Sequence, residues 1–269
     1  MFNQVLIIAG VARSGTSWLG EIINSSPDVA YRYQPLFSHA FKNRIGIDSP
    51  REDYEAFLQE VYASHDPFLL QTDKRIAGIY PTFAKQPEPA CLAMKKARYH
   101  YLHIKFLAHF KQLKLLAIIR NPCAVLASWM ANPKEFPPGS DPWAEWRLGH
   151  CKNQGMAENF FGFYKWRETT NIFLDLQAQH PNRVHLVRYE DLVESPRRVT
   201  ESIYDFAHLE LGTQTEAFLA ECNSSHSDSP YAVYKSKSVR DRWRQTLDAR
   251  IIRDVHEELK DTRLEAFLA

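Results

Sequence analysis

The strongest information about the fold lies in the segment QVLIIAGVARSGTSWLGEII, residues 4–23 of the chain. Gln4–Ala9 is a short apolar run rich in β-branched residues, which is typical of a buried parallel strand. Residues 10–15 form a glycine-bearing loop, and from Thr16 apolar side chains recur at helical spacing until Pro27. A strand, a loop and a helix in this order form the opening unit of a nucleotide-binding α/β fold.

Two further apolar runs predict strands of the same sheet. Leu113–Ile119 leads into Arg120, and Val184–Arg188 ends at Tyr189. We also expect a strand leading into a helix at residues 99–106, helices at 155–179, 196–208, 213–222 and from Asp248, a loop at 131–141, and short helices and loops at 28–95. Strands separated by helices predict one α/β domain, residues 1–269, whose P-loop-like parallel sheet is flanked by helices.

The composition excludes several classes of protein. With 33 Lys and Arg against 32 Asp and Glu, the net charge is +1, so no overall field attracts nucleic acid or an acidic membrane. Anion binding must therefore be local.

The apolar run at residues 5–9 is too short for a signal-peptide core or a membrane span. The four cysteines are far apart and form no CxxC pair, which predicts reduced thiols and no metal site.

The loop GVARSGTS, residues 10–17, resembles the phosphate loop of nucleoside triphosphatases with one substitution. Gly10, Gly15 and Ser17 fit the pattern G-x-x-x-x-G-K-[ST], but Thr16 stands where the lysine belongs. Successive backbone amides at a helix N-terminus still suit an anion, and Arg13 supplies a cation three residues earlier. This combination fits a phosphate joined to a sulfate, which needs no metal, better than a triphosphate with magnesium.

A second anion site is predicted where the next strand meets its helix. The strand delivers Arg120 to the carboxyl edge of the sheet, where open α/β sheets bind ligands. Asn121 and Ser128 are seven residues apart and share one helix face, with a rise of roughly 10 Å between them. Arginine and serine near a helix start suit a second, separate phosphate.

Three segments together resemble the sulfotransferases that use 3′-phosphoadenosine 5′-phosphosulfate (PAPS), and the carbohydrate sulfotransferases most of all. RSGTSWL (13–19) is similar to their 5′-phosphosulfate loop and LLAIIRNPCAVLASWM (115–130) to their 3′-phosphate motif. VHLVRYEDLVESP (184–196) is similar to a third family segment, and the order and spacing agree from residue 4 to about 208. The resemblance implies the sulfotransferase fold.

The resemblance also implies roles for individual residues. The 5′-phosphosulfate would be held by Arg13, Ser14, Gly15, Thr16 and Ser17, the 3′-phosphate by Arg120 and Ser128, and the adenine would lie near Trp18 and Tyr189. Lys105 resembles a family lysine that approaches the transferring sulfate. The basic segment SKSVRDRWRQTL (236–247) resembles one that closes over the nucleotide, with Arg240, Arg242 and Arg244 as candidates.

The residue that takes the acceptor's proton is the point at which the chain departs from the family pattern. The family has a Glu-Pro pair after the first helix, whereas this chain has Gln34 before Pro35. Glutamine cannot take a proton at neutral pH, so Gln34 is expected to orient the acceptor. His39 is the first candidate for the base, followed by His103 and Asp73.

The resemblance implies transfer of a sulfuryl group from PAPS to an acceptor hydroxyl, with 3′-phosphoadenosine 5′-phosphate (PAP) as product and a saccharide as the favoured acceptor. Trp143 and Trp146 are candidates for stacking on it. The related Golgi enzymes are membrane-anchored, and the lack of an anchor here predicts a cytoplasmic protein. Two alternatives are a magnesium-dependent P-loop nucleotide kinase and a catalytically inactive PAPS-binding module.

Overall fold

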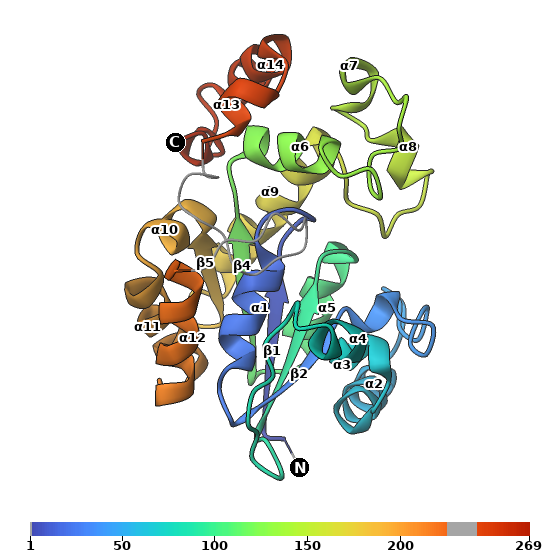
Figure 1. Cartoon of the computed structure of the whole chain (residues 1–269). Helices are drawn as coiled ribbons and strands as arrows, with labels where there is room; N and C mark the ends of the chain where they lie inside the picture. Colours follow the sequence, from blue (N-terminus) through green and yellow to red (C-terminus); the bar gives the residue numbers. More distant parts are fainter. Residues whose placement is uncertain (1, 225–240) are drawn as a thin grey trace.

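The computed structural model, which describes residues 2–224 and 241–269, is built on a five-stranded parallel sheet with helices on both faces (Figure 1). The strand order is β2-β3-β1-β4-β5. The strands are β1 (Gln4–Ala9), β2 (Val29–Tyr33), β3 (Cys91–Lys96), β4 (Leu113–Ile119) and β5 (Val184–Arg188). Because all the strands run in the same direction, their carboxyl ends meet at one edge, which is where ligands bind in such sheets.

Side-chain alternation along β1 divides the core between the two faces. Leu6 and Ile8 pack with α1 (Thr16–Asn24), α10 (Tyr189–Glu194), α11 (Pro196–Ala207) and α12 (Thr213–Ser224). Val5 and Ile7 pack with α2 (Arg51–Ala63), α5 (His103–His109), α6 (Pro122–Met130), α9 (Phe163–Gln179) and α14 (Ala249–Leu259). Both faces are covered, which explains why the strands are apolar almost throughout.

Short elements connect these layers. They are η1 (Pro35–Phe37), α3 (Pro67–Leu70), α4 (Thr72–Ile76), η2 (His100–Leu102), α7 (Pro142–Glu145), α8 (His150–Asn153), α13 (Trp243–Thr246) and η4 (Glu265–Phe267). None of the helices in the described part of the chain is long and apolar enough to cross a membrane. All four cysteines are free thiols.

The structure confirms most of the predicted elements and corrects three regions. The strands at 4–9, 113–119 and 184–188, the helices near 196, 213 and 248, and the loop at 131–141 are present. The strand expected at 99–106 is wrong, since η2 and α5 occupy those residues. Instead, β2 and β3 come from the proline-rich region 28–95. The helix expected from 155 begins only at Phe163, after Gly162 adopts φ +87°.

Candidate active site

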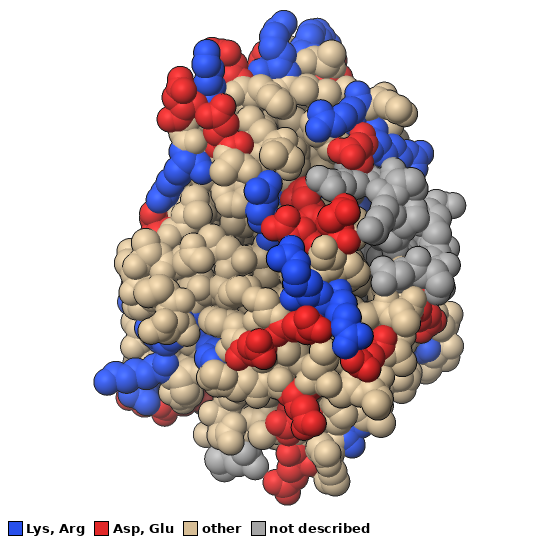
Figure 2. Space-filling view, turned by 90° about the vertical axis from the view of Figure 1, so that its left-hand side faces the viewer, with Lys and Arg blue, Asp and Glu red and all other residues tan. Residues whose placement is uncertain are grey.

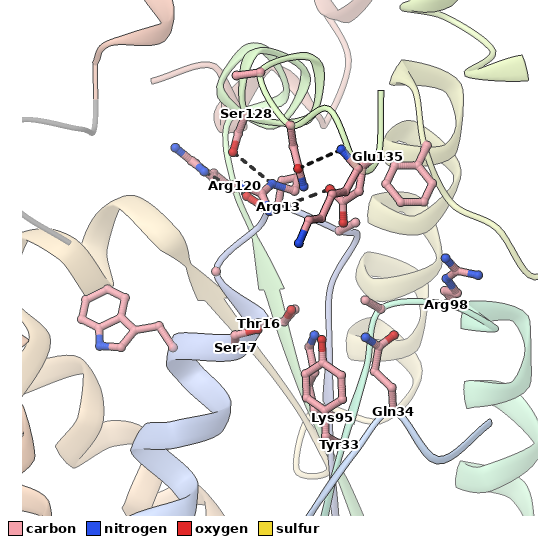
Figure 3. A pocket seen from close by; sticks show the side chains of 18 of the residues that line it. Arg13, Thr16, Ser17, Tyr33, Gln34, Lys95, Arg98, Arg120, Ser128 and Glu135 are labelled. Atoms are coloured by element: carbon pink, nitrogen blue, oxygen red, sulfur yellow. Dashed lines mark hydrogen bonds and ion pairs between the residues drawn. The ribbon is translucent and has the colours of Figure 1, made fainter. Parts of the chain in front are cut away.

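The carboxyl edge of the sheet opens into a cavity of about 1010 Å³ (Figure 3). This volume lies at the upper end of the range typical of small-molecule and cofactor sites. The ends of β1, β2, β3 and β4 meet there with the first residues of α1 and α10, with α6 and the loop after it, and with α13. Elements far apart in the sequence therefore supply one site.

The phosphate loop is held against the sheet by its two glycines. A Cβ atom on Gly10 would lie 2.7 Å from the Ile118 carbonyl oxygen, and one on Gly15 would lie 2.5 Å from the Tyr189 ring. Gly15 also adopts φ +89°, in the left-handed region that favours glycine. Because α1 begins at Thr16, its first amides have no partner within the helix and can donate to an anion.

Arg13 links this loop to α6. Its Nε donates a hydrogen bond to the Ser128 Oγ at 3.1 Å, and its Nη1 lies 3.8 Å from a carboxylate oxygen of Glu135. Arg13 itself has φ +73°, a left-handed backbone that is uncommon outside glycine. The structure therefore brings together the loop and the serine that the sequence assigns to two separate phosphates.

Arg120 is fixed from several directions at the end of β4. Its Nη1 donates to the Arg13 carbonyl oxygen at 2.9 Å, and its guanidinium lies 4.4 Å from the centre of the Tyr189 ring. The Trp166 Nε1 donates to the Arg120 carbonyl oxygen at 2.9 Å. The buried Arg120 Nε has no hydrogen-bond partner among the described residues, so a donor remains for a ligand oxygen.

The helix that follows begins as the sequence predicts. The Asn121 Oδ1 accepts from the backbone amides of Cys123 and Ala124 at 2.9 and 3.3 Å, which caps α6. The backbone N–H of Asn121 in turn donates to the Glu190 Oε1 at 3.0 Å. This cap sets the axis of α6 and therefore the position of Ser128 over the cavity.

The aromatic residues assigned to the adenine lie beside the loop. Trp18 and Tyr189 meet edge to face, with their ring centres 6.4 Å apart, and both line the cavity while being largely buried. Arg242 and Trp243 of the C-terminal segment also line the cavity. The sequence resemblance selects only the arginines of this segment. Arg240 lies outside the described residues. Arg244 is exposed and does not line the cavity.

Lys105 does not line the cavity, since it lies on α5, whereas Lys95 is a buried lysine of the cavity lining. Lys95 lies near the end of β3, is 4% exposed, and its ammonium lies 4.3 Å from the centre of the Tyr33 ring. Burial lowers the pKa of Lys95 to about 7, with Glu135 opposing the shift and Arg13 and Arg98 adding to it.

Only some of the residues proposed as the proton acceptor lie at the cavity. Gln34 lines the cavity, whereas His39 is exposed beyond η1 and does not. His103 is buried against His100, with ring nitrogens 3.2 Å apart, and burial holds its pKa well below the ordinary value. Asp73 lines the cavity from α4. Glu135, which no sequence motif indicates, is the other carboxylate among the described lining residues.

The two tryptophans expected to stack on the acceptor lie elsewhere. Trp146 is fully buried, packs against Phe163 and is covered by the Arg147 guanidinium 3.9 Å from its ring centre. Trp143 is partly exposed but does not line the cavity. The aromatic side chain that combines exposure with a place in the cavity is Phe37, which is 45% exposed.

Positive charge is concentrated in the cavity. Its described lining contains two carboxylates, Asp73 and Glu135, against eight basic side chains: Arg13, Lys74, Lys95, Arg98, Arg120, Lys134, Lys152 and Arg242. On the face of the molecule that carries α10 to α12, by contrast, Figure 2 shows acidic and basic side chains interspersed. No cluster of potential metal ligands occurs in residues 2–224 or 241–269. The site is therefore built for a polyanion.

Comparison with known proteins agrees with this geometry. A profile described as the sulfotransferase family matches residues 5–213. The chain belongs to the sulfotransferase family. Carbohydrate sulfotransferase 3 of Tetronarce californica is 22% identical, with 94% of this chain and 69% of the relative covered. Carbohydrate sulfotransferase 3 of Mus musculus is 25% identical, with 90% and 63% covered, so the chain spans about two thirds of these relatives' length.

Solved structures support the same fold. A mouse sulfotransferase complexed with PAP superposes with a TM-score of 0.57 at 13% identity, covering 98% of this chain and 88% of the other. A retinol dehydratase in complex with retinol and PAP gives 0.56 at 14% identity, covering 98% and 83%. The predicted sulfotransferase fold, a P-loop-like parallel sheet flanked by helices, is confirmed.

Proposed function

We propose that this protein transfers a sulfuryl group from PAPS to a hydroxyl group of a saccharide. The observation that carries the proposal is the convergence of Arg13, Arg120 and Ser128 at one cavity, with the amides of a helix N-terminus beside them. Two anion sites joined in this way suit a nucleotide with separate 3′ and 5′ anionic groups. Family membership supports the same reaction.

The described residues include the cations and hydrogen-bond donors that the anionic groups of PAPS require. Arg13 and the amides from Gly15 to Ser17 would hold the 5′-phosphosulfate, while Arg120 and Ser128 would hold the 3′-phosphate. PAPS supplies the sulfuryl group, and negative charge then develops on the oxygen that bridges phosphorus and sulfur. Arg13 stabilises charge at that position because its guanidinium is preorganised and largely buried, at 12% exposure. We refer to these residues, with Trp18 and Tyr189, as the nucleotide end of the cavity.

The opposite part of the cavity, the acceptor end, comprises Gln34, Phe37, Lys95, Arg98 and Glu135. The Arg98 guanidinium lies 4.2 Å from the centre of the Phe37 ring, which holds that exposed ring in place. A flat apolar surface beside polar groups is suited to the face of a sugar ring. The names of the curated relatives support a saccharide acceptor.

The nucleotide half is tested first by calorimetric titration with PAP and, separately, with ATP and magnesium. We expect micromolar PAP binding without metal, weakened at least about 100-fold in Arg120→Ala, because charge-assisted hydrogen bonds to phosphate are lost. Arg197→Ala is the matched control, since Arg197 is exposed on α11 outside the cavity. Binding of magnesium-ATP alone would identify a nucleotide kinase and overturn the proposal.

Transfer is tested with sulfur-labelled PAPS and a panel of galactose, N-acetylglucosamine, N-acetylgalactosamine and polymers of these sugars. Labelled product from at least one of them is expected. PAP binding without transfer to any of them would instead support an inactive binding module. The cytoplasmic location expected from the sequence stays a prediction.

A further inference from the structure

The reaction proposed above, on which this inference depends, requires a group that takes the proton of the acceptor hydroxyl. Gln34 lies where the family pattern has a glutamate, and an amide cannot serve. Among the described residues lining the cavity there is no histidine, and the side chains considered as proton acceptors are the two carboxylates, Asp73 and Glu135, and the buried lysine beside Gln34, Lys95.

Glu135 is held rigidly where it lies, on the loop that follows α6. Its backbone amide donates to the Asn132 carbonyl oxygen at 2.9 Å, and its carbonyl oxygen accepts from the Trp129 Nε1 at 3.0 Å. The buried Asn132 side chain further braces the loop by accepting from the Lys134 amide at 3.2 Å. A side chain on a backbone fixed from both sides is preorganised, as catalysis requires.

The surroundings of Glu135 place it where sulfuryl transfer would occur. A carboxylate oxygen lies 3.8 Å from the Arg13 Nη1, in the loop assigned to the 5′-phosphosulfate, and the side chain is 15% exposed. Glu135 is also the largest charge influence on Lys95, the buried lysine beside Gln34. The backbone N–H of Gln34 donates to the Lys95 carbonyl oxygen at 2.9 Å. In Figure 3, Gln34 and Lys95 project from the sheet edge into the space below Glu135.

The other two groups are less suitable. Asp73 is exposed on the first turn of α4, where water surrounds it. The charges of Arg13 and Arg98 disfavour the ammonium form of Lys95, but the anions of the donor nucleotide favour it, and an ammonium has no lone pair to accept a proton. Glu135 differs from both, because it is 15% exposed and its carboxylate oxygen lies 3.8 Å from the Arg13 Nη1.

We infer that Glu135 accepts the proton of the acceptor hydroxyl, replacing the base that Gln34 cannot provide. As the hydroxyl oxygen bonds to sulfur, Glu135 receives the hydroxyl proton. The bond between sulfur and the bridging oxygen breaks, and its electron pair stays on the phosphate oxygen. Acceptor alcohol and PAPS thus become a sulfate ester and PAP, and Glu135 passes the proton to water.

The test compares Glu135→Gln and Glu135→Asp with wild-type protein, using labelled PAPS and the saccharide panel named above. We expect kcat to fall about 10²–10⁴-fold in Glu135→Gln and less in Glu135→Asp, which retains a carboxylate. PAP affinity, measured by calorimetry, should be equal or higher, because a negative charge beside Arg13 is removed. The acidic limb that a carboxylate base gives to the kcat profile should be present in wild type and absent in Glu135→Gln.

Glu201→Gln is the matched control, since it makes the same change at an exposed carboxylate on α11 outside the cavity, and it should keep kcat within about threefold of wild type. Unchanged kcat in Glu135→Gln, or loss of kcat only in Asp73→Asn, would overturn the role of Glu135 while leaving the sulfotransferase function in place. Loss of PAP binding in parallel with kcat would show that Glu135 only positions Arg13. A wild-type protein that binds PAP and transfers nothing would overturn the proposed function itself.

Discussion

The nucleotide end of the cavity is formed by two strand–loop–helix units, β1–α1 and β4–α6, whereas the acceptor end is formed by η1, the last residues of β3 and the loop after α6. At the nucleotide end, polar contacts join the two units directly, from Arg13 to Ser128 and from Arg120 to Arg13. At the acceptor end, the contacts include ring–cation pairs such as Arg98 on Phe37 and Lys95 on Tyr33. Directed hydrogen bonds specify one ligand closely, whereas aromatic surfaces tolerate related ones.

Among the substitutions that distinguish the two ends, the largest loss of stability and of PAP affinity is expected at Gly15. In Gly15→Ala the new methyl group would collide with the Tyr189 ring, in a backbone conformation that disfavours alanine, and the free energy of unfolding should fall by about 1–3 kcal/mol. PAP affinity should fall with it, as measured by denaturant unfolding and calorimetry. Gly46→Ala is the control, because a Cβ atom at Gly46 would have no described atom within 4 Å, and both quantities should stay unchanged. Equal effects of the two variants would mean that the loop is not tightly packed.

The next effect concerns the charge of Lys95, the buried lysine of the acceptor end. Burial lowers the pKa of Lys95 to about 7, and anion binding favours its protonated form, so binding above pH 7 must take up a proton. PAP affinity should therefore be constant below about pH 7 and fall by up to about tenfold per pH unit above it. Titrations in buffers with different ionisation enthalpies measure the proton uptake directly.

Lys95→Met should remove this pH dependence, while Lys105→Met should preserve it, because Lys105 lies on α5 outside the cavity. If Lys105→Met removed the pH dependence and Lys95→Met preserved it, Lys105 would be the lysine near the donor, as the sequence resemblance implies. That result would also place the sulfuryl end of the donor away from β3.

The smallest effect is expected for Phe37 at the acceptor end. Removing its ring in Phe37→Ala should raise the acceptor KM about three- to tenfold, because one stacking surface worth about 1 kcal/mol is lost. PAP affinity should not change, since the nucleotide end is untouched. Trp143→Ala, which removes a similarly exposed ring outside the cavity, should leave both constants unchanged. A change in PAP affinity for Phe37→Ala would show that the two ends are not separate.

The same division governs what can be predicted from the sequence. β1, β4 and β5 are visible because they are apolar runs bounded by turn or cap residues, and the anion-binding residues follow them directly along the chain. The segment CLAMKK of β3 escapes prediction because it ends in two lysines, which are rarely buried, yet all six residues are buried here. The resemblance to a family lysine before the 3′-phosphate motif selects Lys105, whereas the cavity is lined by Lys95 of the strand that the sequence does not reveal.

Glu135 cannot be found from the sequence for a related reason. It lies in a proline-containing loop with no periodic pattern, and its partner Arg13 is more than a hundred residues away. Only the packing of α6 against the phosphate loop brings the two together. His39, by contrast, is a candidate because it is close to Gln34 in sequence, but η1 turns the chain and leaves His39 at the surface.

The hydrogen bond from Arg13 to Ser128 has a consequence for selectivity among cellular nucleotides. Because Arg13 already donates to Ser128 within the protein, a ligand that takes either residue gains only the difference between its own contact and this internal one. A nucleotide with a 5′-phosphate alone can occupy Arg13 but leaves the Ser128 hydroxyl without its partner. A nucleotide with anionic groups at both the 5′ and the 3′ position gives Arg13 and Ser128 each a new partner, which replaces the hydrogen bond between them. This internal contact is therefore expected to disfavour abundant adenine nucleotides with an unmodified 3′-hydroxyl relative to nucleotides that carry a 3′-phosphate.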